Sequence, residues 1–346
     1  MGKEYVACDL CGSDETTEVL RAPDRNIALW VSDPARVATE QWVLVRCRRC
    51  GLTYLNPRPT KDSIGAYYPA QYYAFADNPS QGRFSKWQAI LSRAKRLTKQ
   101  WLRRRRVTYS FANRLLSRDA VGDPIVEIIG FVKPGKVLDV GCGAGSYLDR
   151  LKSLGWETYG IEINQAGADI ARGKGHKVWI GDASSAELPR SFFDVAVLSH
   201  VLEHLFAPRE VLIRIREAMA SGGIVIVDVP NWESPWSRLF GQYNWALDLP
   251  RHLYHFEQAT LLKLVSGVGF TVRCCTTRAT PRFLCWSLAL MAYEKANWEG
   301  GGTSPCRDIG EFLRECRPDE MLDDFCRALE SHGWGNQLRL VAVKEQ

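Results

Sequence analysis

The feature that most constrains the fold is the glycine-rich segment VLDVGCGAGSYL at residues 137–148. An apolar run that a parallel sheet would bury contains Asp139 near its end and leads into Gly-Cys-Gly-Ala-Gly. Because glycine lacks a Cβ atom, this turn can be tight and a ligand can approach the backbone closely. The next apolar run ends at Glu162, 21 residues after Gly141, where a carboxylate can accept hydrogen bonds from a ribose diol. The segment predicts a nucleotide-like ligand at the carboxyl ends of two neighbouring parallel strands.

The second half of the chain alternates short apolar runs with stretches of helical periodicity. This alternation is typical of an α/β fold, because parallel strands are joined by crossover helices. The expected strands cover residues 136–140, 157–162, 177–181, 194–200, 223–229, 270–276 and 337–344. A helix at about 207–220 is expected to end at Ser221-Gly222-Gly223. We therefore expect an α/β domain over residues 132–346, with a helical insertion at about 278–335 before the last strand.

Two matching C-x-x-C-G pairs near the N-terminus predict a metal site. The two thiolates of each pair can reach one tetrahedral ion, and the following glycine permits a tight turn that aims N–H groups at sulfur. The two pairs are separated by 35 residues and consist of Cys8, Cys11, Cys47 and Cys50. Because four protein ligands leave no open position for water, we predict a structural Zn²⁺ ion in a module of residues 1–60.

The composition of the 346 residues excludes several classes of protein. A hydrophobic share of 46% fits a globular chain, and no apolar run reaches the roughly 18 residues of a membrane span. The first ten residues lack the basic head and apolar middle of a signal peptide. Eleven cysteines without an export signal do not predict disulfides. We expect a cytoplasmic protein.

The positive charge is concentrated in residues 81–118, which hold 12 Lys and Arg and no Asp or Glu, in a chain of net charge +6. This segment belongs to a tyrosine-rich and basic connector of residues 61–131, for which we expect one or two helices. On a helical wheel its apolar side chains gather on one side and most basic side chains on the other. Three interpretations stay open: a helix docked on the rest of the chain, a helix on the inner face of an anionic membrane, and a phosphate-binding surface.

Four motifs occur in one order over residues 136–230: VLDVGCGAG, YGIEIN, GDA and FDVAVLSHVLEHL. The glycine spacing is G-x-G-x-G, which differs from the G-x-G-x-x-G of dinucleotide sites. The segment resembles the class I S-adenosylmethionine-dependent methyltransferases. The resemblance implies a seven-stranded Rossmann-like sheet and S-adenosyl-L-methionine as cofactor. It also implies that the cofactor lies against Asp139, Gly141, Cys142, Gly143, Glu162, Ile163, Asp182, Ala183, Ser199 and His200.

The same resemblance implies a role for most of these residues. The glycine loop faces the methionine portion, Glu162 binds the ribose hydroxyls, and Ile163 packs on the adenine. Asp182 contacts the adenine amino group, while Ser199 and His200 lie near the sulfonium. For an apolar position such as Ile163, ordinary core packing is the alternative.

A second resemblance covers most of the chain. The cysteine pairs, LNPRPT at 55–60, YYPAQYY at 67–73, the methyltransferase core and PRHLYHF at 250–256 follow the order of a bacterial subgroup. That subgroup includes deoxysugar C-methyltransferases and enzymes of surface-glycan and secondary-metabolite clusters. It implies a small-molecule acceptor: a sugar, a nucleotide sugar or a related biosynthetic metabolite.

Two other functions stay open. The first is an RNA methyltransferase that uses the zinc module and the basic connector to bind RNA. Residues 1–40 are on balance acidic, which disfavours nucleic acid as a partner. The second is a scaffold that binds the cofactor but does not catalyse a reaction. The intact glycine loop and Glu162 favour cofactor binding, but they do not distinguish a scaffold from an enzyme.

Methyl transfer to a hydroxyl or carbon acid needs a proton acceptor, and histidine titrates near neutral pH. His200 and His204 follow the fourth strand in SHVLEHL, and His252 and His255 lie after the fifth strand in PRHLYHF. Both pairs are expected at the ligand-binding edge of the sheet. The candidate catalytic residues are His252, His255, His204 and Tyr254. His204 has an alternative role, in which it lines the cofactor site and caps the next helix.

Other side chains could serve an acceptor pocket or a metal. The Tyr67–Tyr73 cluster and Trp245 could wall the pocket, or pack between connector and core. Glu203 and His204, taken with Asp194, could be read as a metal cluster. No third ligand follows at a suitable spacing, so we expect no metal there.

Overall fold

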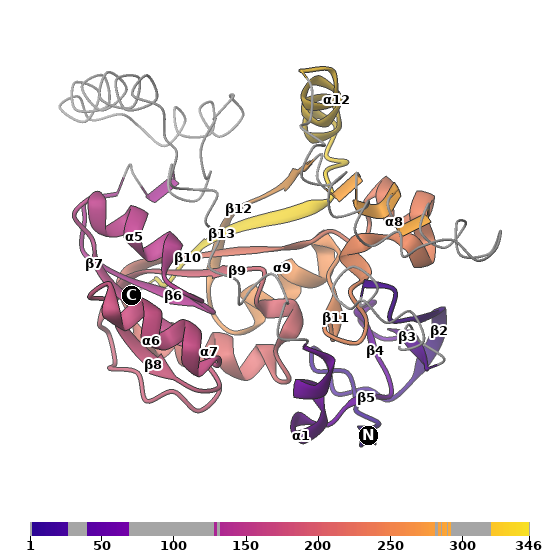
Figure 1. The fold of residues 1–346 in the computed structure, drawn as a ribbon, viewed down its shortest axis with the longest axis horizontal. Helices are drawn as coiled ribbons and strands as arrows, with labels where there is room; N and C mark the ends of the chain where they lie inside the picture. The colour runs from indigo at the N-terminus through magenta and orange to yellow at the C-terminus, as the bar shows by residue number, and fades with distance from the viewer. Residues whose placement is uncertain are drawn as a thin grey trace, which may run out of the picture.

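The computed structural model describes residues 2–26, 40–68, 128–129, 132–280, 283–284, 286–288, 290–291 and 320–345. Its centre is a seven-stranded sheet of strand order β12-β13-β10-β9-β6-β7-β8 (Figure 1). The strands are β6 (Lys136–Val140), β7 (Glu157–Glu162), β8 (Lys177–Ile180), β9 (Phe193–Ser199), β10 (Met219–Pro230), β12 (Thr271–Arg278) and β13 (Gln337–Val343). All seven expected strands are therefore present, and the α/β class is confirmed.

The sheet is mixed, because one strand runs against the others. β8, β7, β6, β9 and β10 are parallel neighbours, whereas β13 is antiparallel to both β10 and β12. Arg278 at the end of β12 pairs with Gln337 at the start of β13, so β13 begins where β12 ends and runs in the opposite direction between β10 and β12. Apolar periodicity cannot reveal this reversal, because a buried strand has the same pattern in either direction.

Helices cover both faces of this sheet. The helices that follow β6 include α5 (Ser146–Ser153), α6 (Gln165–Gly173), α7 (Pro208–Ala218), α8 (Pro235–Phe240), α9 (Gln258–Gly267) and α12 (Glu320–Ser331), of which α5, α7 and α9 pack on the sheet. Along β9, Val195 and Val197 pack in the core on the α5 side, while Ala196 and Leu198 pack on the α7 and α9 side. This alternation follows from the two-residue repeat of a strand. Both faces are buried, as expected for crossover helices.

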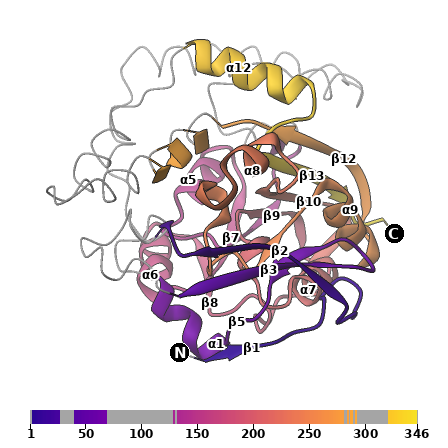
Figure 2. The same ribbon diagram turned by 90° about the vertical axis from the view of Figure 1, so that its right-hand side faces the viewer.

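A smaller antiparallel sheet lies beside the central one, in the order β11-β4-β3-β2. Its strands are β2 (Thr16–Pro23), β3 (Gln41–Cys47), β4 (Thr53–Leu55) and β11 (Tyr254–His255). β1 (Lys3–Glu4) pairs separately with β5 (Arg58–Pro59), and α1 (Lys61–Ile64) follows. Figures 1 and 2 show these N-terminal elements against one side of the molecule.

The N-terminal module shares this small sheet with the second half of the chain. β11 pairs with β4 through the partners Tyr254–Tyr54 and His255–Thr53. One apolar core runs from Trp42 in the module to Phe256 beyond β11. Residues 1–60 thus do not pack as an isolated unit, and the PRHLYHF segment is held by the module.

The end of the helix after β9 differs from the expectation. α7 ends at Ala218 and not at Ser221-Gly222-Gly223, because Met219 already pairs with Phe193 as the first residue of β10. The register shifts between Met219 and Ile224, and Gly222 adopts a φ of +76° in that bulge. Gly222 therefore belongs to a β-bulge and not to a helix end. A glycine with a positive φ is suited to either structure.

Two expectations concern segments that lie wholly or partly outside the described residues. The basic segment at 81–118 lies outside the described residues, so its three interpretations stay predictions. Of the insertion expected at 278–335, the described part contains short helical pieces between residues 283 and 291 and helix α12. Among the residues that the structure describes, no helix has the length and apolar character to cross a membrane.

Candidate active site

The glycine loop after β6 has the backbone that its sequence predicts. Gly141, Gly143 and Gly145 have φ angles of +73°, +52° and +78°, a region that side chains other than glycine rarely adopt. A Cβ atom on Gly141 would lie 2.6 Å from Cγ2 of Val201, the second residue after β9. The loop therefore touches the segment that carries the histidines, and only glycine fits there.

Glu162 ends β7 directly beside this loop. Its carboxylate is buried and accepts hydrogen bonds from the backbone N–H of Gly143, at 2.8 Å, and of Asn164, at 2.7 Å. The next side chain, Ile163, is 71% exposed, which is unusual for isoleucine. The structure thus presents a fixed carboxylate and an open apolar side chain next to the glycine turn.

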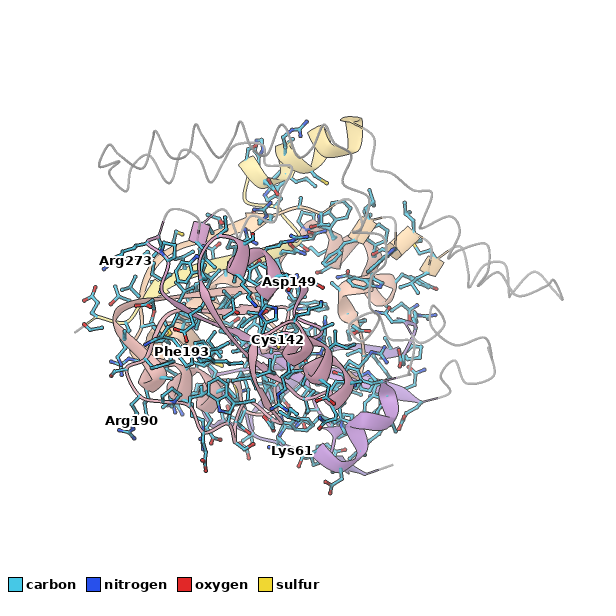
Figure 3. All side chains as sticks on the ribbon, turned by 60° about the vertical axis from the view of Figure 1, so that its left-hand side comes forward. Lys61, Cys142, Asp149, Arg190, Phe193 and Arg273 are labelled. Atoms are coloured by element: carbon cyan, nitrogen blue, oxygen red, sulfur yellow. The ribbon has the colours of Figure 1, made fainter. Side chains whose placement is uncertain are left out.

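Asp182 and Ala183 follow β8. The Asp182 carboxylate accepts a hydrogen bond of 2.8 Å from the N–H of Ser184 and lies 3.3 Å from Nζ of Lys61. Burial would raise the pKa of Asp182, but these contacts lower it. Ala183 is buried. Lys61 belongs to α1, directly after the N-terminal module, so the start of the connector reaches this edge of the sheet (Figure 3).

Two of the predicted cofactor residues point into the protein. Asp139 is buried in β6. Cys142 packs in an apolar cluster with Leu148 of α5 and Ala168 of α6, and burial raises the pKa of its thiol. Figure 3 shows Cys142 in the interior of the domain. In the described conformation, only the backbone of Cys142 can face a ligand in the loop.

Ser199 and His200 end β9 and begin the turn toward the histidine cluster. His200 has a φ of +55°, uncommon for a residue with a side chain, and its N–H donates to the Asp228 carbonyl at 2.9 Å. Its Nδ1 atom lies 3.3 Å from Oε1 of Glu203. Burial would lower the pKa of His200, but the hydrogen bond and the charge of Glu203 raise it.

Glu203 is the centre of the cluster, a role that its place in the sequence did not predict. Its side chain has no exposed surface, and its carbonyl accepts a 2.8 Å hydrogen bond from the N–H of Leu253. Oε1 lies 4.0 Å from Nε2 of His252, and Oε2 is buried without a hydrogen-bond partner in the described part of the chain. Burial would raise the pKa of Glu203, but His200 and the other histidines lower it to about 2.

Three of the four predicted catalytic residues surround Glu203. The ring centroids of His204 and His252 are 4.5 Å apart, and those of His252 and His255 are 6.3 Å apart. Burial and the neighbouring His252 lower the pKa of His204 to about 4 and of His255 to about 3. Both rings are therefore neutral near pH 7. Nε2 of His255 is buried and has no hydrogen-bond partner in the described structure.

Tyr254 does not join this cluster. It precedes His255 on β11, so the two side chains point to opposite faces of the small sheet. Its hydroxyl donates to the Phe206 carbonyl at 3.2 Å and accepts from Arg58 at 3.3 Å. Burial raises the pKa of this phenol. A catalytic role for Tyr254 stays a prediction, and in the described structure its hydroxyl lies away from the histidine cluster.

The structure also corrects the expectation that Glu203 and His204 lack a third metal ligand. His252, 48 residues further along the chain, brings a ring nitrogen close to them, and the three ligand atoms lie within 4.8 Å of one another. Asp194 is at the opposite end of β9, where it accepts a hydrogen bond from the N–H of Lys136. Sequence spacing cannot reveal a ligand that the fold brings from another loop.

The four cysteines of the N-terminal pairs come together as predicted. Cys8 and Cys50 have Sγ atoms 3.4 Å apart, Cys11 and Cys47 have them 3.5 Å apart, and all four sulfurs lie within 4.8 Å of one another. Zn–S bonds of about 2.3 Å place tetrahedral sulfur ligands roughly 3.8 Å apart, so the cluster fits zinc.

The turn after each cysteine pair is also suited to a metal. Gly12 and Gly51 have φ angles of +73° and +86°, and their N–H groups bond back to the carbonyls of Cys8 and Cys47. Burial would raise the pKa of Cys47, but N–H groups of the same turn and the sulfurs of Cys11 and Cys50 lower it to about 7. A thiol with that pKa is readily ionised for a metal.

The aromatic residues have mixed positions. Tyr67 packs edge-on against Trp42 in the module core, whereas the hydroxyl of Tyr68 lies 3.2 Å from Nδ1 of His204. Trp245 is buried against Phe283. Tyr72 and Tyr73 lie outside the described residues. Among the described aromatic candidates, Tyr68 thus comes nearest to the histidines.

A buried arginine that the sequence did not single out ties the histidine segment to the module. Arg251 has no exposed side-chain surface and bonds Asp24 of the module at 2.7 and 2.8 Å. It also bonds Asp248 at 2.8 Å. The two carboxylates raise the pKa of Arg251 against the effect of burial. The sequence signal for this contact is that Arg251 directly precedes His252 in the PRHLYHF motif.

A strand, a glycine turn and a helix, with a carboxylate at the end of the next strand, form the arrangement that the resemblance to class I S-adenosylmethionine-dependent methyltransferases implies. Residues 111–274 match the family model described as methyltransferase domain. The match covers a little under half of the chain.

Individual relatives are distant. A probable S-adenosylmethionine-dependent methyltransferase of Mycolicibacterium smegmatis is 26% identical over 178 residues, 50% of this chain and 60% of that protein. A ubiquinone biosynthesis O-methyltransferase of Nitrosomonas europaea is 30% identical over 126 residues, 34% of this chain and 52% of that protein. The chain spans about half the length of these curated relatives.

Solved structures resemble the fold at low sequence identity. A crystal structure of a methyltransferase from Archaeoglobus fulgidus that depends on the same cofactor has 21% identity and a TM-score of 0.42. The similarity covers 68% of this chain and 100% of that one.

Proposed function

We propose that this chain transfers the methyl group of S-adenosylmethionine to a small-molecule acceptor: a sugar, a nucleotide sugar or a related biosynthetic metabolite. One observation carries the proposal. The glycine loop touches the segment after β9, and that segment meets His252 and His255 in a buried cluster. A donor site and a group of neutral imidazoles thus adjoin at one edge of the sheet.

The residues around the glycine loop fit the donor. Each oxygen of Glu162 holds one backbone N–H and keeps a second lone pair for a ribose hydroxyl. Ile163 offers an exposed apolar surface for the adenine, and Asp182 an ionised carboxylate for its amino group. The missing Cβ atoms of Gly141 and Gly143 leave room for the methionine portion. When bound, the donor supplies a methyl group on a positively charged sulfur.

His255 is the residue we assign to the acceptor. His255 lines a cavity of about 10 Å³ together with Asn231, Asn244 and Trp232, and its Nε2 has no hydrogen-bond partner among the described residues. A cavity of this size holds one water-sized group, such as a hydroxyl. Because the pKa of His255 is held at about 3, its ring stays neutral and can accept a hydrogen bond from that hydroxyl. His255 would therefore orient the acceptor.

The setting of the cluster favours a small acceptor over RNA. His252 and His255 are 5% and 4% exposed, so a polymer cannot approach these rings in the described conformation. The motif order that resembles the deoxysugar C-methyltransferase subgroup supports a sugar as the acceptor. The RNA alternative has no matching observation among the described residues.

Zinc in this proposal is structural. Cys8, Cys11, Cys47 and Cys50 would hold the ion and join the two turns that flank β2 and β3. With four thiolates the ion keeps no open position for a reactant. Its contribution would be to hold the sheet against which β11 and His255 are placed.

An acceptor screen with methyl-labelled donor tests the proposal. We expect label in a nucleotide sugar or similar metabolite and none in RNA. His255→Ala should lower kcat roughly 100-fold, the effect expected when a reactant is misplaced by about 1 Å, without changing the donor affinity measured by calorimetry. His332→Ala, which changes an exposed histidine of the α12 end, should leave both unchanged. Label only in RNA would overturn the acceptor class.

A further inference from the structure

We propose that Glu203, His204 and His252 form a second metal site, which binds a divalent transition-metal ion that prefers imidazole and carboxylate ligands, such as Zn²⁺, Mn²⁺ or Fe²⁺. One ring nitrogen of each histidine and one carboxylate oxygen lie within 4.8 Å of one another. The site has no thiolate, and it lies in the histidine cluster and not among the four cysteines. It therefore differs in chemistry and place from the predicted zinc site.

The two histidines are oriented as metal ligands usually are. Nδ1 of His252 lies 2.9 Å from the carbonyl oxygen of Ala246, and Nδ1 of His204 lies 3.0 Å from that of Arg251. A carbonyl can only accept, so each Nδ1 carries the proton and each Nε2 keeps its lone pair. Metal-binding histidines commonly donate their other ring N–H to such a carbonyl, which fixes the ring and its tautomer.

Glu203 supplies the second, independent observation. Its side chain has no exposed surface, and Oε2 is buried without a hydrogen-bond partner in the described residues. Leaving a carboxylate oxygen buried and unpaired is costly, so such an atom calls for a ligand. A cation held between Glu203 and the two imidazoles would neutralise this buried carboxylate. The other oxygen, Oε1, lies 3.3 Å from Nδ1 of His200 and 4.0 Å from Nε2 of His252, so it is the oxygen that faces the histidines.

The spacing suits an ion after a small adjustment. Nε2 of His252 lies 4.0 Å from Oε1 of Glu203. Metal bonds of about 2.0–2.2 Å place tetrahedral nitrogen and oxygen ligands roughly 3.4 Å apart. Rotations that move these atoms by less than about 1 Å would close the site.

The ligand set leaves the ion open to a reactant. Three protein ligands are typical of catalytic metal sites, in which water or substrate takes the next position. Resting on the function proposed above, an acceptor oxygen at that position would lose its proton more easily, because the ion polarises it. His204 and His252 would then act through the metal, while His255 remains free to orient the acceptor.

Counting metal ions in the full chain tests the site. Protein dialysed against Zn²⁺ and desalted should hold two ions per chain. His252→Asn and His204→Asn should each hold one, because asparagine can still donate to the backbone carbonyl but lacks the Nε2 ligand. His332→Asn, at an exposed histidine, should keep two. Thermal melting of each variant checks that the fold is retained.

Cobalt shows which site is filled. Co²⁺ in the cysteine cluster gives a thiolate charge-transfer band, and Co²⁺ in the histidine site gives only weak ligand-field bands. We expect wild type to show both and His252→Asn to keep only the thiolate band. A single ion per wild-type chain, or an asparagine variant that keeps both, would overturn the proposal. If the wild-type protein transfers methyl groups but holds one metal ion per chain, the second metal site is refuted and the proposed function is not. If it holds two ions per chain but transfers no methyl group to any acceptor, the proposed function is refuted and the second metal site is not.

Discussion

At the scale of single residues, the proposed donor site depends on a carboxylate at the end of β7. Glu162→Ala should raise the Kd for S-adenosylmethionine by at least roughly tenfold, because each hydrogen bond to a charged group contributes about 1.5–3 kcal/mol. Isothermal titration calorimetry measures this change. The matched control is Glu157→Ala at the other end of the same strand, where the carboxylate pairs with Lys177 on the surface.

Glu157→Ala should bind the donor as tightly as wild type. If Glu162→Ala does so too, the ribose assignment is wrong, provided that its melting curve stays cooperative. The control matters because Glu162 also holds the N–H groups of Gly143 and Asn164. If Glu162→Ala loses affinity because the protein unfolds, the loss reports on stability and does not test the ribose contact.

The candidate site was predictable where its residues are close in sequence. The glycine turn, Glu162 and the four cysteines follow from spacing, because the local backbone alone brings them together. Glu203 did not follow, since its partner His252 comes from a loop 49 residues away. The isolation of Tyr254 from its neighbour His255 is a consequence of strand pairing, which local pattern cannot supply.

At the scale of elements, the loop before β11 is attached to the module by two arginines of different burial. Arg251 is fully buried between Asp24 and Asp248, whereas Arg46, 46% exposed, bonds Glu257 at 2.7 Å. Arg251→Met should lower the free energy of unfolding by about 3–5 kcal/mol, because two buried carboxylates lose their counter-charge. Arg46→Met should cost less than about 1 kcal/mol.

Urea unfolding of the two variants measures the difference. Equal and small losses would mean that the buried arginine contributes no more than the exposed one, and that the burial of its carboxylate partners adds nothing. The two substitutions are matched, because each removes an arginine that bridges the module and the domain. They differ in whether water can solvate the carboxylates left behind.

The elements themselves were largely visible in the sequence. Buried strands of the central sheet have long apolar runs, so their number and place were predictable. β11 was not, because two residues cannot show a period and its partner β4 lies some 200 residues earlier. The end of α7 differs from the prediction because Gly222, which in sequence resembles a helix stop, belongs to a bulge in β10.

At the scale of the whole molecule, the small sheet connects the proposed zinc site with the proposed acceptor side. The predicted zinc joins the turns of the small sheet, the sheet pairs with β11, and β11 carries His255. The donor loop instead lies on β6 and α5 of the central sheet. Cys47→Ser should therefore remove the cysteine-bound metal and lower methyl transfer by at least roughly tenfold, since a small misplacement of catalytic groups is costly.

The same variant should keep the S-adenosylmethionine affinity within about threefold of wild type. The N-terminal part of the chain contacts the donor site through the ion pair of Lys61 with Asp182, and because this pair is exposed it contributes little free energy. Metal analysis, calorimetry and the transfer assay on one preparation separate these effects. Cys275→Ser, in β12 of the central sheet, is the matched control and should retain metal, affinity and turnover. If Cys47→Ser lost donor binding together with turnover, the module would support the entire domain and not the acceptor side alone.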